Sequence, residues 1–140
     1  MVRQWLTCAA RGLWRPLTAS LHKFRTWREK HKANEEIRRA RGLTLLREWL
    51  SPEQKAMFEA ASYFDVIGSD SGNRYRIYHG TAGNVHEIDH AGRPVMGLCF
   101  VPSQALVPGD VMLAQKIALE TNEREALVVA KRFPVFSREF

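Results

Sequence analysis

Apolar residues recur at helical spacing near the start of the chain. Residues three or four positions apart would share one helical face: Leu6, Ala9, Leu13, Leu17, Leu21 and Phe24. A stripe with this period predicts an amphipathic helix over residues 2–28. Pro16 lacks a backbone donor and crowds the preceding turn, so we expect a kink or split near Arg15.

The next segment, residues 28–42, is dominated by charge. Its glutamates precede its arginines at spacings that stabilise a solvated helix, and Gly42 is expected to end that helix. A short amphipathic helix is expected over residues 43–50. Ser51 then predicts the start of another helix, because Pro52 suits its first position and Gln54 can close a capping box.

Alternation replaces the helical period between residues 63 and 101. Four runs have strand composition, separated by turns: 63–68, 74–79, 84–89 and 93–101. Their spacing predicts an antiparallel meander. A helical stripe returns later, with Asp110 as its predicted cap and Leu113, Ala114 and Ile117 as its buried side. The stripe changes phase over 120–124, so we expect a bend or restart near Thr121-Asn122.

These elements predict an α+β fold. We expect an N-terminal helical arm, an antiparallel β-meander of three or four strands, and a C-terminal helix packed on one sheet face. The predicted domains are a basic amphipathic arm at 1–42, a compact domain at 43–133 and a tail at 134–140. The core should be dominated by large apolar residues: Met57, Phe58, Tyr75, Ile77, Leu98, Phe100, Leu113 and Ile117.

Positive charge is concentrated in the arm. The chain of 140 residues has a net charge of +6. Residues 1–47 hold 12 Lys/Arg against 3 Asp/Glu, whereas residues 48–140 hold 9 against 12. This asymmetry predicts an anionic partner for the arm. The candidate contacts are the cations Arg3, Arg11, Arg15, Lys23, Arg25, Arg38, Arg39 and Arg41.

The identity of that partner stays open between two classes. The acid-free stripe of residues 2–28 and its tryptophans favour an anionic membrane surface. The arginines at 38–41 favour nucleic acid. The same stripe could instead pack on a protein partner or a second copy, or belong to a transit-like leader. We expect a small non-catalytic interaction or regulatory module that docks through the arm.

The predicted sheet carries a second candidate surface. Arg74, Arg76 and Tyr78 should share one face, opposite Tyr75 and Ile77. Aromatic and basic side chains on a sheet can stack bases and hold phosphates.

Little in the sequence indicates catalysis or a cofactor. Four ligand-type residues lie on or beside the meander: His79, His86, His90 and Cys99. The spacing of His86 and His90 occurs in zinc sites, but the usual Cys-x-x-Cys half is absent. No nucleophile elbow or phosphate loop is present. We expect no enzyme activity, cofactor or metal, and the alternative is a small metal-binding or enzymatic domain that uses these four residues.

The cysteines and hydropathy predict a location. Cys8 and Cys99 lie far apart, which is typical of a reduced compartment. No apolar run approaches the ~20 residues of a membrane span, and Arg11 and Arg15 interrupt any signal-peptide pattern. We expect a cytoplasmic protein, with peripheral association at the inner face of the membrane as the alternative.

Short motifs in the compact domain recur together elsewhere. They are Ser51-Pro52-Glu53-Gln54, Tyr75-Arg76-Ile77, Asn84-Val85, Ile88-Asp89, Gly92-Arg93, Cys99-Phe100-Val101-Pro102 and the run from Gly109 to Glu120. On these motifs, residues 46–133 resemble a group of short uncharacterised bacterial proteins. The resemblance implies a transferable domain of helix, meander and helix without the basic arm, and it implies no activity.

Overall fold

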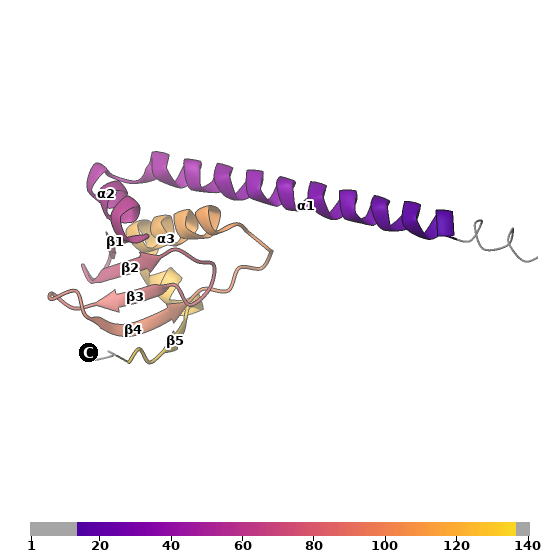
Figure 1. Ribbon diagram of the computed structural model, residues 1–140. Helices are drawn as coiled ribbons and strands as arrows, with labels where there is room; N and C mark the ends of the chain where they lie inside the picture. Colours follow the sequence, from indigo (N-terminus) through magenta and orange to yellow (C-terminus); the bar gives the residue numbers. More distant parts are fainter. Residues whose placement is uncertain (1–13, 137–140) are drawn as a thin grey trace, which may run out of the picture. The chain divides into compact units, whose positions relative to one another are not determined.

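The computed structural model describes the backbone of residues 14–136 and the side chains of residues 19–136 (Figure 1). Its first helix, α1, spans Trp14–Trp49. The chain divides into two units, Met1–Ile37 and Arg38–Phe140. Pro16 lies in the first described turn, and the residues before Trp14 that would define a kink lie outside the described residues.

An antiparallel sheet of five strands forms the centre of the second unit. Each strand pairs with its neighbour in sequence, so the spatial order is β1-β2-β3-β4-β5. The strands are β1 (Tyr63–Ile67), β2 (Arg74–Tyr78), β3 (Val85–Ile88), β4 (Pro94–Cys99) and β5 (Lys131–Phe133). This confirms the predicted α+β class and meander. The fifth strand was not expected, because three residues are too few to show alternation.

The sheet has one buried and one partly exposed face. Tyr75 and Ile77 are at most 1% exposed, whereas Arg74, Arg76 and Tyr78 are partly exposed, as the alternation predicts. We call the first face the inner face and the second the outer face. Helix α3 (Pro108–Val129) packs against the sheet, as predicted.

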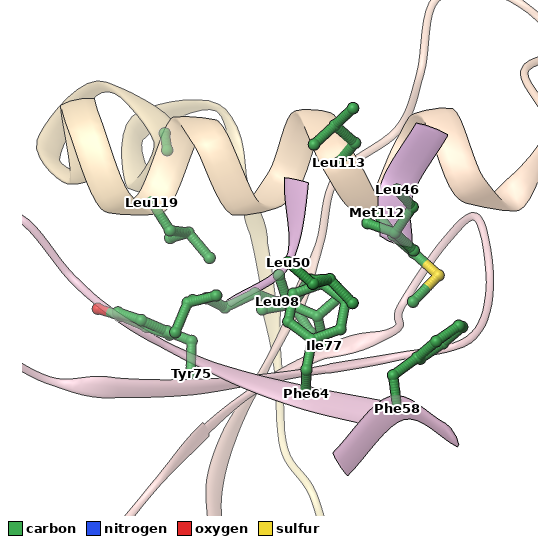
Figure 2. Packing of buried hydrophobic residues seen from close by; sticks show 13 residues of the cluster. Leu46, Leu50, Phe58, Phe64, Tyr75, Ile77, Leu98, Met112, Leu113 and Leu119 are labelled. Atoms are coloured by element: carbon green, nitrogen blue, oxygen red, sulfur yellow. The ribbon is translucent and has the colours of Figure 1, made fainter. Parts of the chain in front are cut away.

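The core lies between the inner face and the helices (Figure 2). Of the predicted core residues, five are buried: Phe58, Tyr75, Ile77, Leu98 and Leu113. Met57 and Phe100 are partly buried against them. The prediction for Ile117 is wrong, since this side chain is 41% exposed.

Polar residues explain why the buried face of α3 differs from the predicted one. Met112 and Leu119 are buried on that face, together with Gln115 and Lys116. Gln115 exchanges two hydrogen bonds with Asn84, at 2.8 and 2.9 Å, and the ammonium of Lys116 contacts the carboxylate of Glu120. Because both polar groups have partners, their side chains can be buried. The predicted buried side was defined by apolar residues alone, so it did not include them.

Gly42 does not end a helix, contrary to prediction. Helix α1 continues through it to Trp49. A methyl group on Gly109 would lie 2.2 Å from the carbonyl carbon of Gly42 and 2.3 Å from its oxygen. The missing side chain at Gly109 therefore lets α3 approach the backbone of α1 directly. Leu46, later in α1, and Leu50, directly after the helix, then reach the core.

Helix α2 (Pro52–Ala61) begins with the predicted capping box. The hydroxyl of Ser51 accepts the N–H of Gln54 at 3.2 Å, and the Gln54 side chain accepts the N–H of Ser51 at 3.1 Å. The same Gln54 amide donates to the carbonyl of Asp65 and to Glu120. The cap therefore ties α2 to both β1 and α3.

Replacing Ser51 with alanine should lower the free energy of unfolding by about 1 kcal/mol, because it leaves an N–H at the start of α2 unpaired. Urea denaturation measures this change. Ser103→Ala, at an exposed loop residue, is the matched control and should leave the midpoint unchanged. Equal midpoints for the two variants would show that the cap does not contribute.

The ends and middle of α3 test two further predictions. The helix begins at Pro108 after Val107, so the prediction of Asp110 as the cap is wrong. Asp110 lies in the first turn, where a carboxylate still interacts favourably with the helix N-terminus. The predicted interruption is confirmed, because Asn122 has non-helical angles (φ −152°, ψ 55°).

Candidate functional site

The described part of the arm is a solvent-exposed helix. From residue 19 to residue 37, every side chain except that of Thr26 is exposed. Leu21, Phe24 and Trp27 follow one another at three-residue spacing and are 63%, 59% and 55% exposed. The ring centroids of Phe24 and Trp27 lie 5.9 Å apart. We call these three residues the arm apolar row.

Cations accompany the arm apolar row. Residues 19–32 contain five Lys/Arg and one acid, Glu29. Arg25, Arg28 and Lys32 surround a shallow hollow with that acid. Among the predicted arm contacts, Lys23 and Arg25 are exposed on this helix. Arg3, Arg11 and the side chain of Arg15 lie outside the described residues.

The three remaining arm arginines belong to the second unit. Arg38, Arg39 and Arg41 are all exposed on α1. Arg38 and Arg41 line a hollow of about 230 Å³ together with Asp110 of α3. The acidic side chain reduces the positive potential that this cluster presents to a phosphate.

Asp65 organises the predicted sheet-face residues. Its carboxylate accepts hydrogen bonds from Arg76 Nε at 2.7 Å and from Arg74 Nη2 at 3.0 Å. The hydrogen bond to Asp65 raises the pKa of Arg76. Tyr78 packs against Tyr63. The structure therefore brings Arg74, Arg76 and Tyr78 together on the outer face. Asp65 lies with them and was not among the predicted site residues.

The four ligand-type residues are spread over the sheet. His79 and His90 lie beyond opposite ends of β3, His86 lies within it, and Cys99 ends β4. Burial lowers the pKa of His86. Among residues 14–136, no group of three or more His, Cys, Asp or Glu is arranged to hold a metal ion.

Glu123 has a buried carboxylate, and the sequence did not predict it as a site residue. It is 1% exposed. One oxygen accepts the hydroxyls of Ser71 and Tyr75, each at 2.5 Å. The other accepts the backbone N–H groups of Asp70 at 2.8 Å and Ser71 at 2.7 Å. Any side chain on Gly68 would overlap this carboxylate, because a methyl group there would lie 2.3 Å from Glu123 Cδ.

The Glu123 site also holds the restart of α3. The N–H of Glu123 donates to the Ser69 hydroxyl at 3.1 Å, and the N–H of Arg124 donates to the Asp70 carboxylate at 3.0 Å. The turn between β1 and β2 thus caps the helix after its kink at Asn122. The phase change over 120–124 and the polar turn at 69–71 were the two sequence signals of this contact.

Hydrogen bonding determines the charge state of Glu123. Burial alone would raise its pKa, but the hydrogen bonds from Ser71, Tyr75 and Asp70 outweigh burial and lower the pKa to about 2. Burial and the hydrogen bond to Glu123 raise the pKa of Tyr75. Both side chains are at most 1% exposed, and the pair joins the turn between β1 and β2 to the restart of α3.

An apolar hollow of about 330 Å³ lies between α3 and the loop after β4. Phe100, Val101 and Leu106 contribute from the loop, and Ala114 and Ala118 from the helix. Polar atoms are few on its lining, so its surface offers mainly van der Waals contacts.

Two further findings concern the chain as a whole. In the part of the chain that the structure describes, no helix is long and apolar enough to cross a membrane. No protein-family model, curated protein or solved structure matches the sequence.

Proposed function

We propose that the chain is a non-catalytic interaction module that docks on an anionic membrane surface through its arm. The observation that carries the proposal is the arm apolar row, whose three large side chains are each more than half exposed beside a set of cations. A helix of this kind can lie in the lipid interface with its apolar side chains among the acyl chains and its cations at the headgroups.

The arginines at 38–41 support nucleic acid less well than the arm apolar row supports a membrane. Arg38 and Arg41 share their hollow with Asp110, so the cluster does not present three unopposed charges. Phosphate binding would also leave Phe24 and Trp27 without a role, since positive charge alone neutralises a phosphate and apolar side chains are not required.

The non-catalytic part of the proposal has its own support. The hydroxyl and carboxylate at Tyr75 and Glu123 are closed to solvent. His79 and His90 lie in separate connections beyond the ends of β3, and Cys99 ends β4. General acid–base or nucleophilic catalysis needs such groups within hydrogen-bond reach of one another and of a substrate.

Co-sedimentation with vesicles tests the membrane proposal. The full-length chain should bind vesicles that contain anionic phosphatidylglycerol and not vesicles of neutral phosphatidylcholine, and salt should weaken binding. In the charge variant, Lys23→Gln, Arg25→Gln and Arg28→Gln are combined. At about 1 kcal/mol for each cation near an anionic surface, its affinity should fall roughly 100-fold at low salt.

The apolar variant combines Phe24→Ser with Trp27→Ser and should lose binding by at least about tenfold. Lys55→Gln, at an exposed cation of α2, is the matched control and should bind as the unmodified chain does. An affinity for anionic vesicles that is the same in the charge variant, the apolar variant and the unmodified chain would contradict the proposal. A dimer in sedimentation velocity that the apolar variant abolishes, without vesicle binding, would assign the arm apolar row to self-association instead.

A further inference from the structure

Four rings cross the outer face of the sheet. They come from four strands: Tyr63 of β1, Tyr78 of β2, His86 of β3 and Phe133 of β5. Successive ring centroids lie 5.6, 5.0 and 6.0 Å apart. All four side chains are partly exposed. We call them the outer aromatic row, and they extend from one edge strand of the sheet to the other.

A glycine makes room for the last ring of the row. A methyl group on Gly97 would lie 2.2 Å from Phe133 Cε2 and 2.3 Å from Phe133 Cζ. The ring of Phe133 therefore occupies the space over β4 that a side chain would otherwise fill. It also lies 6.0 Å from the ring of His86, so the row continues across β4 although that strand contributes no ring.

Cations border the outer aromatic row. The guanidinium of Arg76 lies over the ring of Tyr63, 4.2 Å from its centroid, and covers one face of that ring. Asp65 accepts two hydrogen bonds from Arg76 and one from Arg74, so two cations face one acid. A guanidinium has five N–H donors, and each arginine keeps donors that Asp65 does not use. Lys131, two residues before Phe133, is exposed on the same side of β5.

We propose that the outer aromatic row binds single-stranded nucleic acid, with bases stacked on its rings and phosphates held by Arg74, Arg76 and Lys131. Stacking on aromatic side chains requires bases that are free of a duplex, which selects single strands. The excess of cations over the one acid, Asp65, matches the phosphate backbone. This site uses none of the arm residues, so it is independent of membrane docking.

The charge state of His86 agrees with this role. Burial lowers its pKa, which favours the neutral form of the ring. Arg76 on β2 is paired with His86, Asp65 on β1 is paired with Arg76, and Lys131 lies on β5 beyond β4. A neutral imidazole stacks on a base as the other rings do, and the cations beside it supply the phosphate contacts.

Fluorescence anisotropy with labelled oligonucleotides tests the proposal on the full-length chain. The probes are oligo-U RNA and oligo-dT DNA of about 12 nucleotides, with a duplex of the same length for comparison. Every measurement uses the charge variant of the arm, Lys23→Gln with Arg25→Gln and Arg28→Gln, as the background, which we call the arm charge variant. Arg38, Arg39 and Arg41 are unchanged in it, so the sheet variants below decide whether binding belongs to the outer aromatic row. We expect binding to both single strands and at least tenfold weaker binding to the duplex.

Ring and cation variants then locate the contact. Tyr78→Leu and Phe133→Leu should each weaken binding about tenfold or more, whereas Tyr78→Phe keeps the ring and should change affinity less than twofold. Lys131→Gln should lower affinity and reduce the salt slope by about one. Circular dichroism establishes whether each variant is folded. If a leucine variant unfolds, Lys131→Gln and Arg74→Gln carry the test, because Lys131 is exposed and Arg74 is partly exposed.

The outcomes separate this proposal from the arm proposal. Absence of oligonucleotide binding in the arm charge variant would overturn it, as would equal affinity for duplex and single strand. Unchanged affinity in folded ring or cation variants would overturn it as well. Loss of vesicle binding in arm variants that keep oligonucleotide binding would support both proposals, since each partner would then depend on a different surface.

Discussion

Replacing Gly109 with alanine is expected to lower the free energy of unfolding by about 3 kcal/mol. The added methyl group would lie 2.2 Å from the carbonyl carbon of Gly42 and 2.5 Å from the backbone nitrogen of Leu43. Both atoms belong to the backbone of α1, so no side-chain rotation can relieve the overlap. The helices must separate, which opens space around Leu46 and Leu50 in the core.

Gly42→Ala is the matched comparison for this variant. Its methyl group would meet Val107 Cγ2 at 2.7 Å and Asp110 Oδ1 at 3.0 Å. These atoms end side chains that can rotate, and alanine gains up to about 1 kcal/mol of helix propensity over glycine. Gly42→Ala should therefore cost much less than Gly109→Ala in urea denaturation. The reverse order would mean that the two helices are not in backbone contact at Gly109.

Replacing Glu123 with glutamine should remove about 3 kcal/mol of stability at pH 7, together with the part of the acid-induced loss of stability that comes from this carboxylate. The carboxylate has a pKa of about 2 in the folded chain and of about 4.5 when unfolded. A lowered pKa gives stability that is fully present above pH 4.5 and is lost as pH falls toward 2. Glutamine cannot titrate, and its NH₂ group would face N–H and O–H donors.

The measurement is the midpoint of urea denaturation for the Glu123→Gln variant and for the unmodified chain, at a series of pH values between 2 and 7. The difference between them should narrow as pH falls through the interval from about 4.5 to 2. Glu59→Gln, at an exposed acid of α2, is the control and should follow the unmodified chain. A constant difference between the Glu123 variant and the unmodified chain at every pH would exclude the proposed charge effect.

The elements with a clear local pattern were predicted correctly from sequence. Alternation located β1 to β4, and the capping box located the start of α2. The change of phase over 120–124 predicted the interruption of α3 at Asn122. These features depend on neighbours within a few residues, which is the range that hydrophobic periodicity and turn chemistry describe.

The errors concern residues whose environment depends on distant parts of the chain. The residues around Gly42 predict a helix end, but Gly42 lies inside α1, where its backbone is in close contact with Gly109. Gln115 was not among the predicted buried residues of α3, because its partner Asn84 lies 31 residues earlier. Glu123 could not be assigned, because its four donors come from the turn between β1 and β2 and from Tyr75 in β2, all more than 45 residues earlier.

Candidate sites were partly predictable for the same reason. The alternation of β2 placed Arg74, Arg76 and Tyr78 on one face. It could not show that Tyr63, His86 and Phe133 join that face, because strand register is determined by pairing between segments. Leu21 and Phe24 of the arm apolar row belong to the stripe predicted from the sequence, but Trp27 was not part of that stripe and the exposure of the row could not be predicted.

The sequential order of the strands has a consequence for how the chain folds. Each of the first four strands can pair as soon as the next one is available, through short loops that cost little entropy to close. The fifth strand must wait for the whole of α3, and the contact between Gly42 and Gly109 closes a still longer loop. A meander with mostly local pairing favours fast formation of the first hairpins. We therefore expect the hairpins from β1 to β4 to form early, with the docking of α1, α3 and β5 as the later, slower steps.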